Sequence, residues 1–378
     1  MTHFPSLSQA LHAIKGRAGY LINLKTEPWF GRHISLQRTF PYLLFRKIVP
    51  ERFLSVRIDI TNKCNLRCKM CYFSMEKVKQ QPRTEMPVQL FRKIARQVFP
   101  VARQLIISAG AEPLYAKDFP KMLEIVADYD IPHTAFFTNG TLLNEQNITT
   151  IIASGISLIT ISFDGATAHT YEAIRRGAKF DRVINNIRLL QHIKRQMASS
   201  TPALHFGVVL MQTNIAELPD LLRLAKDLGI ERVTASHLVP YSELGTKTES
   251  LRETPDLANT YLDNARQVAQ EIGIAFDAPP NFTQEPPQPI PPESHQSPPT
   301  CHWPWDEILI RPDGSVNPCC YWYENMSMGN FSTQSFKQIW HGNAYQTLRH
   351  ELTTHSLREM CRRCPEMSSQ SREVEVVK

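Results

Sequence analysis

The sequence predicts an α/β fold: a partial (β/α)6 TIM-like barrel followed by a small C-terminal α+β domain. Three observations lead to this prediction. Six short apolar runs alternate with amphipathic helical stretches, small and polar residues follow the ends of those runs, and a proline-rich stretch separates this region from a cysteine-rich end. Repeated strand–helix units give right-handed crossovers and a parallel sheet. An open doubly wound sheet has the same element count, but the unusual residues after the strands favour a barrel, whose active site lies at that rim.

The elements follow from the spacing of apolar residues. The predicted strands are Leu54–Ile60, Gln104–Ser108, His133–Thr138, Leu158–Ser162, Leu204–Leu210 and Arg232–His237. The predicted helices carry apolar residues three and four positions apart, and they are Val88–Val98, Phe119–Tyr129, Asn144–Ala153, Arg182–Met197, Leu218–Leu228 and Leu257–Ile272. A last short apolar run, Ile274–Ala278, follows the final helix.

Composition divides the 378 residues into four parts. Residues 1–50 form a basic N-terminal extension with seven Lys and Arg against one Glu, which accounts for the whole net charge of +6. Residues 51–278 form the barrel, residues 279–300 a linker with nine prolines, and residues 301–378 the C-terminal domain. The balanced charge after residue 50 disfavours a nucleic-acid partner.

The basic extension also contains aromatic and aliphatic residues. Such a segment can contact an anionic lipid surface, an acidic peptide or a phosphorylated substrate, or it can pack as a helix on the main domain. No apolar run approaches the ~20 residues of a membrane span, and no secretory signal pattern opens the chain. The predicted location is the cytoplasm.

Eight cysteines fall into two groups, Cys64, Cys68 and Cys71 near the start and Cys301, Cys319, Cys320, Cys361 and Cys364 near the end. Clustered thiols in a reducing compartment more often bind metal than form disulfides. The first group is a C-x3-C-x2-C run directly after a strand. Three thiolates do not complete a structural zinc site, whereas a three-ligand iron–sulfur cubane keeps one iron open. Zinc with a distant fourth ligand is the alternative.

This run resembles the signature of the radical S-adenosylmethionine (radical SAM) superfamily, and the resemblance extends over about residues 54–240. Gly110-Ala111-Glu112-Pro113 is similar to the Gly-Gly-Glu-Pro motif, with Ala111 in place of the second glycine. Further matches in the family's order are Thr138-Asn139-Gly140, Ser162-Phe163-Asp164-Gly165 and the segment Tyr171–Arg175. Met70 stands where the family often has an aromatic residue.

The resemblance implies a [4Fe-4S] cluster on the three cysteines that binds S-adenosylmethionine (SAM) and cleaves it to a 5′-deoxyadenosyl radical. The implied cofactor-binding residues are Gly110, Glu112, Pro113, Asn139, Ser162, Asp164 and Arg175, with the arginine facing the cofactor carboxylate. A low-potential electron donor, a flavodoxin or ferredoxin, is implied as the partner.

The second group contains a C-x12-G-x4-C unit, from Cys301 through Gly314 to Cys319, that resembles the opening of the SPASM auxiliary-cluster domain. A hairpin with a Pro-Asp-Gly turn is predicted inside it. With Cys361 and Cys364, four ligands suffice for a second [4Fe-4S] cluster, as in the shortened, twitch-like form. Cys320 is an alternative to Cys319, and structural zinc is an alternative to the cluster.

The function predicted first is hydrogen abstraction from a small molecule, such as a sugar, an aminocyclitol or a lipid-linked substrate, in a dehydrogenase- or epimerase-type reaction with the auxiliary cluster as electron relay. The shortened C-terminal domain and the short N-terminal extension favour this over a peptide-modifying maturase of the SPASM type. A non-catalytic metal-binding module is the third hypothesis. Weak candidates for a proton acceptor are His237, Tyr241 and Asp277, although the sequence favours an ordinary polar loop residue at each position.

Overall fold

The computed structural model describes residues 52–282, 301–320, 327–354, 356–362 and 364. The predicted basic extension and most of the predicted linker lie outside the described residues. The described residues belong to one compact unit that begins at Arg52.

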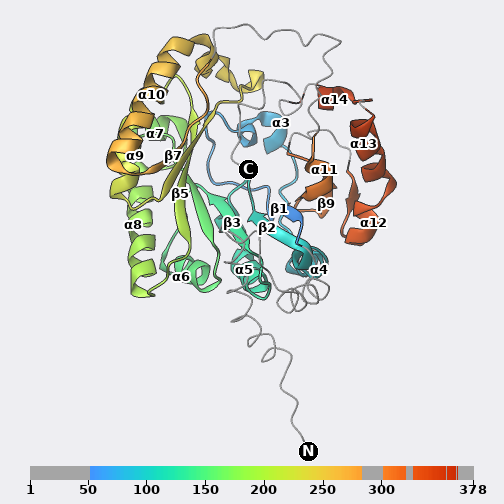
Figure 1. The fold of residues 1–378 in the computed structure, drawn as a ribbon. Helices are drawn as coiled ribbons and strands as arrows, with labels where there is room; N and C mark the ends of the chain where they lie inside the picture. Colours follow the sequence, from blue (N-terminus) through green and yellow to red (C-terminus); the bar gives the residue numbers. More distant parts are fainter. Residues whose placement is uncertain (1–51, 283–300, 321–326, 355, 363, 365–378) are drawn as a thin grey trace, which may run out of the picture. The chain divides into compact units, whose positions relative to one another are not determined.

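A mixed sheet forms the centre of this unit (Figure 1). Its ten strands, counted over the described residues, have the order β10-β9-β8-β1-β2-β3-β4-β5-β6-β7. The first seven strands are β1 Leu54–Ile58, β2 Ala102–Ile107, β3 His133–Thr138, β4 Leu158–Ser162, β5 Ala203–Leu210, β6 Arg232–His237 and β7 Ala275–Asp277. Each pairs in parallel with the next. The six predicted strands and their parallel order are confirmed.

Helices connect consecutive strands and lie outside them (Figure 1). The main ones are α4 Val88–Val98, α5 Phe119–Ala127, α6 Glu145–Ala153, α8 Phe180–Gln196, α9 Leu218–Asp227 and α10 Pro255–Ile272, close to the predicted bounds. Shorter elements are η1 Tyr72–Ser74, α3 Glu76–Lys79, η2 Phe99–Val101, η3 Pro113–Tyr115, η4 Ile215–Glu217, η5 Ser242–Leu244, η6 Thr246–Glu249 and η7 Leu251–Glu253. Helix α7, Ala168–Ile174, was not predicted. None of the helices in the described part of the chain combines the length and apolar character that crossing a membrane requires.

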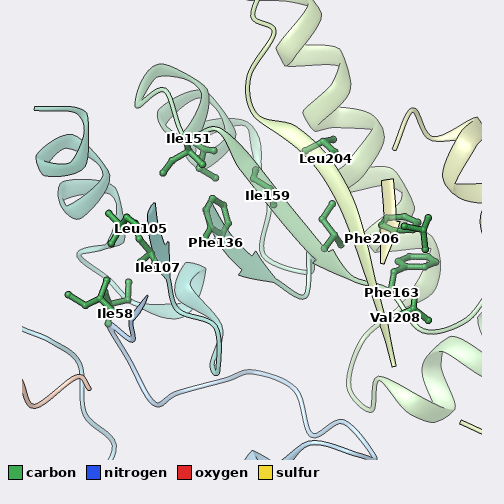
Figure 2. Close-up of a cluster of buried hydrophobic side chains, with 14 of the residues drawn as sticks. Ile58, Leu105, Ile107, Phe136, Ile151, Ile159, Phe163, Leu204, Phe206 and Val208 are labelled. Atoms are coloured by element: carbon green, nitrogen blue, oxygen red, sulfur yellow. The ribbon is translucent and has the colours of Figure 1, made fainter. Parts of the chain in front are cut away.

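The hydrophobic core lies between the outer face of the strands and the helices. In β5 the buried residues Leu204, Phe206, Val208 and Leu210 alternate with less buried ones, as a strand with two different faces requires. Figure 2 shows several of these side chains together with Phe163, whose ring stacks on Phe206 at a centroid distance of 4.5 Å. Fully burying each such side chain contributes about 1.5–3 kcal/mol. This packing fixes the strand ends, and so the positions of the loops that follow them.

The C-terminal segment extends the same sheet instead of forming a layer of its own. Strand β8, Glu307–Ile310, pairs in parallel with β1, and β9, Ser315–Asn317, folds back on β8 around the predicted Pro-Asp-Gly turn. The remaining elements are α11 Trp303–Asp306, β10 Gly329–Asn330, α12 Phe336–Trp340, α13 Asn343–Thr353 and α14 Glu359–Arg362. Without β8, the hydrogen-bonding groups along one side of β1 would be left at an open edge.

Candidate active site

The loops after the parallel strands surround a cavity of about 300 Å³. Its lining includes ten residues that the sequence singled out: Cys64, Cys68, Cys71, Gly110, Glu112, Asn139, Ser162, Arg175, His237 and Tyr241. Residues that sequence reasoning missed also line it, among them Tyr72, Phe137, Val209 and Ser236. Phe137, Val209 and Ser236 are strand positions, and no signal in the sequence distinguishes them from other strand residues.

The cysteine loop, which follows β1, is held against the end of α7 by its backbone. Arg67 N donates to Arg176 O at 3.0 Å, and Lys69 N donates to Ile174 O at 2.8 Å. The Ser74 hydroxyl donates to the Cys68 carbonyl at 2.8 Å. These bonds fix the loop in a conformation that turns all three thiols toward one cavity.

The three thiols are free of disulfides. Burial raises the pKa of each above its ordinary value, in the case of Cys71 to about 11. Thiolates are therefore favoured here only when a cation compensates their charge. Three sulfur donors on one cavity wall fit an iron–sulfur cluster. In the described part of the chain, no three His, Cys, Asp or Glu side chains form a group that could hold a single metal ion.

Glu112 lies buried in the cavity wall with 1% of its surface exposed. Its carboxylate accepts hydrogen bonds from the Thr138 hydroxyl at 2.8 Å, from Asn139 N at 2.7 Å and from Leu114 N at 3.2 Å. Burial raises the pKa of Glu112 to about 7, although these hydrogen bonds oppose the shift. The carboxylate thus joins the loop after β2 to the loop after β3.

Asn139 connects the same loop to the cysteines. Its Nδ2 donates to Asn65 Oδ1 at 2.9 Å and lies 3.9 Å from the Cys64 sulfur. Its Oδ1 accepts from Thr141 N at 2.9 Å, which fixes which way the amide points. An amide N–H directed at a ligating sulfur is the kind of outer contact that tunes a metal centre.

Asp164 and Arg175 form a buried ion pair under the second cysteine. Arg175 Nε donates to Asp164 Oδ2, and Arg175 Nη1 lies 3.7 Å from the Cys68 sulfur. The other oxygen, Asp164 Oδ1, accepts from Val209 N at 2.8 Å. Burial alone would lower the pKa of Arg175, but the charges of Asp164 and Cys68 raise it above its ordinary value. Asp164 does not line the cavity and acts through Arg175, which does.

The weaker candidates separate into two kinds. His237 and Tyr241 line the cavity. Burial lowers the pKa of His237 to about 4, and its ring packs against Phe282 at a centroid distance of 4.4 Å. Asp277 does not line the cavity; both of its carboxylate oxygens lie 2.7 Å from Arg232 Nη1. That exposed ion pair accounts for Asp277 without a role in proton transfer. Pro113 likewise lies outside the lining, at the start of η3, where the Glu112 side chain caps the turn.

The five C-terminal cysteines all fall among the described residues, and none of them forms a disulfide. Cys301, Cys319 and Cys361 are half-buried against the hydrophobic core. Cys361 and Cys364 are joined by a turn in which Cys364 N donates to Cys361 O at 3.3 Å. Burial, and after it the charge of Cys364, raise the pKa of Cys361. The ligand set Cys301, Cys319, Cys361 and Cys364, with Cys320 as the alternative to Cys319, stays a prediction.

Comparison with known proteins matches two domain families to the two cysteine regions. Residues 58–225 match the radical SAM superfamily, and residues 301–365 match SPASM, an iron–sulfur cluster-binding domain. The chain carries a radical SAM domain and a C-terminal SPASM domain. The two matched domains imply a SAM-binding [4Fe-4S] cluster and an auxiliary one, and the sulfur donors of both regions suit them.

Among curated relatives, this radical SAM protein is 30% identical over 175 residues to the probable GTP 3′,8-cyclase of Methanocaldococcus jannaschii, covering 46% of this chain and 56% of the relative. It is 24% identical over 328 residues to the PqqA peptide cyclase of Xanthomonas axonopodis pv. citri, covering 82% and 80%. It is 21% identical to the subtilosin biosynthesis protein AlbA of Bacillus subtilis, covering 82% and 65%. The chain thus spans only about half to two thirds of the length of several curated relatives that it matches.

Two solved structures share the fold. SuiB of Streptococcus suis bound to S-adenosylmethionine has a TM-score of 0.62 and 16% identity, with 98% of this chain and 84% of that chain covered. The enzyme anSMEcpe with bound AdoMet has a TM-score of 0.61 and 18% identity, with 83% of each chain covered. At this identity the likeness establishes the radical SAM partial-barrel architecture.

Proposed function

We propose that this protein is a radical SAM maturase that modifies a peptide. Reductive cleavage of SAM at the bound cluster would supply a 5′-deoxyadenosyl radical that takes a hydrogen atom from the substrate. The chain's own residues would position the reactants: Arg175 at the cofactor carboxylate, and Glu112 and Asn139 holding the loops that enclose it. This replaces the small-molecule substrate that the sequence favoured first.

The observation that carries the proposal is how far each kind of relative matches. The relatives named as a peptide cyclase and as a bacteriocin biosynthesis protein match over 82% of the chain. The relatives named as a GTP cyclase and a heme synthase match over only 46% and 48%. Three of the fold neighbours are named as complexes with a peptide: the precursor peptide SuiA, the Cp18Cys peptide and the Kp18Cys peptide. The similarity that extends beyond the barrel is therefore similarity to peptide modifiers.

The electron donor, the role of the auxiliary cluster and the cellular compartment are also proposals. A flavodoxin or ferredoxin would supply the low-potential electron, and the auxiliary cluster would accept an electron from the substrate or pass one on. We place the reaction in the cytoplasm because clustered thiols persist in a reducing compartment. Contact of residues 1–50 with an anionic surface falls outside the described residues.

The test is anaerobic turnover with a peptide. The reconstituted protein would be incubated with SAM, dithionite and short peptides encoded beside its gene, and both 5′-deoxyadenosine and peptide mass would be measured. We expect 5′-deoxyadenosine together with a peptide mass change, and neither from Cys64→Ala or Glu112→Gln. Formation of 5′-deoxyadenosine with every peptide unchanged, but with turnover of a sugar, would return the assignment to a small-molecule enzyme. Indifference to both substitutions would favour the metal-binding module.

A further inference from the structure

A second cavity of about 560 Å³ opens where β1 and β8 end. These two strands are parallel neighbours, with Ile58 opposite Ile310, so the residues that follow them emerge side by side. Asp59 follows β1, Arg311 follows β8, and Asp59 N donates to Ile310 O at 2.8 Å. The C-terminal segment therefore prolongs the rim on which the active site is built.

Tyr72 lines both this second cavity and the cavity of the cysteines. It directly follows Cys71 in the chain. Its hydroxyl lies close to the SAM-binding loop: a Cβ added at Gly110 would stand 3.3 Å from Tyr72 Oη. A group bound in the second cavity would thus share Tyr72 as a neighbour with a group bound beside the thiols.

The charged side chains that line the second cavity differ in how many hydrogen bonds they make. Asp59 is 9% exposed, and its Oδ1 accepts from Ala109 N at 3.2 Å. Burial raises the pKa of Asp59, while the charge of Arg311 opposes this shift. Asp313 Oδ1 accepts from Ser315 N at 3.0 Å and from the Ser315 hydroxyl at 2.6 Å, so this carboxylate closes the hairpin turn. Both carboxylates on the cavity wall therefore already accept hydrogen bonds from neighbouring residues of the fold.

Arg311 differs from these acids. Its backbone groups close the hairpin with Ser315 and Gly314. Its guanidinium, which lines the cavity and is half-buried, makes neither a hydrogen bond nor a salt bridge with any residue of the described part of the chain. It acts on Asp59 and Tyr72 through its charge alone. A guanidinium presents a planar fork of N–H donors that matches a carboxylate in a bidentate fashion.

We propose that the second cavity binds a carboxylate of the peptide substrate through Arg311 and so holds the neighbouring substrate residue toward the cavity of the cysteines. This inference rests on the proposed peptide-modifying function. The volume of the second cavity falls within the ~300–1,000 Å³ that is typical of ligand-binding clefts. The carboxylate can belong to an Asp or Glu side chain of the peptide or to its C-terminus.

The test is binding, independent of turnover. Reconstituted protein with SAM bound would be titrated against three blocked residues by ligand line broadening in NMR. N-acetylglutamate methylamide carries a side-chain carboxylate, N-acetylalanine carries a terminal one, and N-acetylglutamine methylamide carries neither. We expect one of the acids to bind at least tenfold more tightly than the glutamine probe, and its identity shows which carboxylate is recognised.

Arg311→Gln should remove that preference, and Arg311→Lys, which keeps the charge without the fork, should retain part of it. Arg92→Gln is the matched control, since Arg92 is exposed on α4 and the substitution changes the charge equally. Iron content and thermal midpoint check that each variant is folded and loaded. Equal affinity of the wild-type protein for all three probes, or an unchanged preference in a folded Arg311→Gln variant, would overturn the site.

The two proposals fail separately. If peptides are modified but Arg311→Gln binds the acidic probe as the wild type does, the carboxylate site is wrong and the peptide function stands. If no peptide is modified but the acidic probe binds through Arg311, the site stands as a carboxylate site and the peptide assignment is wrong.

Discussion

Glu112 shows how a single buried carboxylate makes the fold sensitive to pH. Its pKa is raised by burial to about 7 from an ordinary value of 4.5. Between these two pH values the folded state binds more protons than the unfolded state, so the free energy of unfolding falls as pH rises. At 1.36 kcal/mol per pKa unit, the fall amounts to about 3 kcal/mol at most.

Glu112→Gln should therefore flatten the pH dependence of stability in the cluster-free protein. We expect the wild type to lose about 2–3 kcal/mol more than the variant between pH 5 and pH 7.5, measured by urea unfolding. Glu124→Gln, the same change on the exposed side of α5, should leave the wild-type slope intact. Parallel slopes for the wild type and Glu112→Gln would contradict this account.

Asp164 supports a prediction of a different kind, because it is fully buried beside Arg175. Asp164→Asn leaves the guanidinium buried without its counter-charge, which costs about 3–5 kcal/mol. The matched control is Asp220→Asn, which breaks an exposed pair with Arg223 at 2.9 Å and should cost less than about 1 kcal/mol. Urea unfolding at neutral pH measures both, and similar losses for the two variants would show that burial of the pair is unimportant.

At the scale of elements, the β8–β9 hairpin depends on Gly314. Its φ of +81° lies in the left-handed region, and an added Cβ would stand 3.1 Å from both Leu90 Cδ2 and Asn330 Oδ1. Gly155 has a similar φ of +72° with nothing within 4 Å of an added Cβ. Both alanine variants incur the backbone cost of about 1–2 kcal/mol, and Gly314→Ala should lose about 1–3 kcal/mol more from overpacking. Thermal unfolding of the pair isolates the clash, and equal midpoints would exclude it.

The elements also show where sequence reasoning stops. The six strands and the longer helices could be predicted because their apolar residues repeat regularly within each element. Helix α7 was not predicted because its seven residues include only two buried apolar positions, Tyr171 and Ile174, which are too few to show a helical repeat. The pairing of β8 with β1 joins residues some 250 positions apart. Register between strands so distant leaves no mark in local spacing, so this pairing could not be predicted from the sequence.

The same reasoning applies to the site. Spacing identified the cysteines and the residues after each strand, because each motif lies within one loop. Asp59 and Arg311 were missed because they meet only through the β1–β8 pairing. The ion pair of Asp277 with Arg232 could not be predicted either, because it forms between the neighbouring strands β6 and β7.

For the whole molecule, the C-terminal segment completes the sheet, and we predict that it also carries the ligands of the auxiliary cluster; these two roles can be separated. A double variant, Cys361→Ser with Cys364→Ser, keeps β8 on β1 and should lower the iron content from about eight to about four per chain. We expect it to remain folded, as measured by iron analysis and size-exclusion chromatography. An iron content that stays near eight would show that these cysteines are not ligands.

Truncation after residue 300 removes β8 as well and should behave differently. Val56 and Ile58 would lie on an edge strand whose hydrogen-bonding groups had faced Ile308 and Ile310. Exposed, apolar edges of this kind pair with other chains, so we expect the truncated protein to aggregate although Cys64, Cys68 and Cys71 are intact. The readout is the soluble, monomeric fraction by size-exclusion chromatography, compared with the double cysteine variant. A monomeric truncated protein that holds about four irons would mean that β1 tolerates an open edge, and that the SPASM segment serves the chemistry alone.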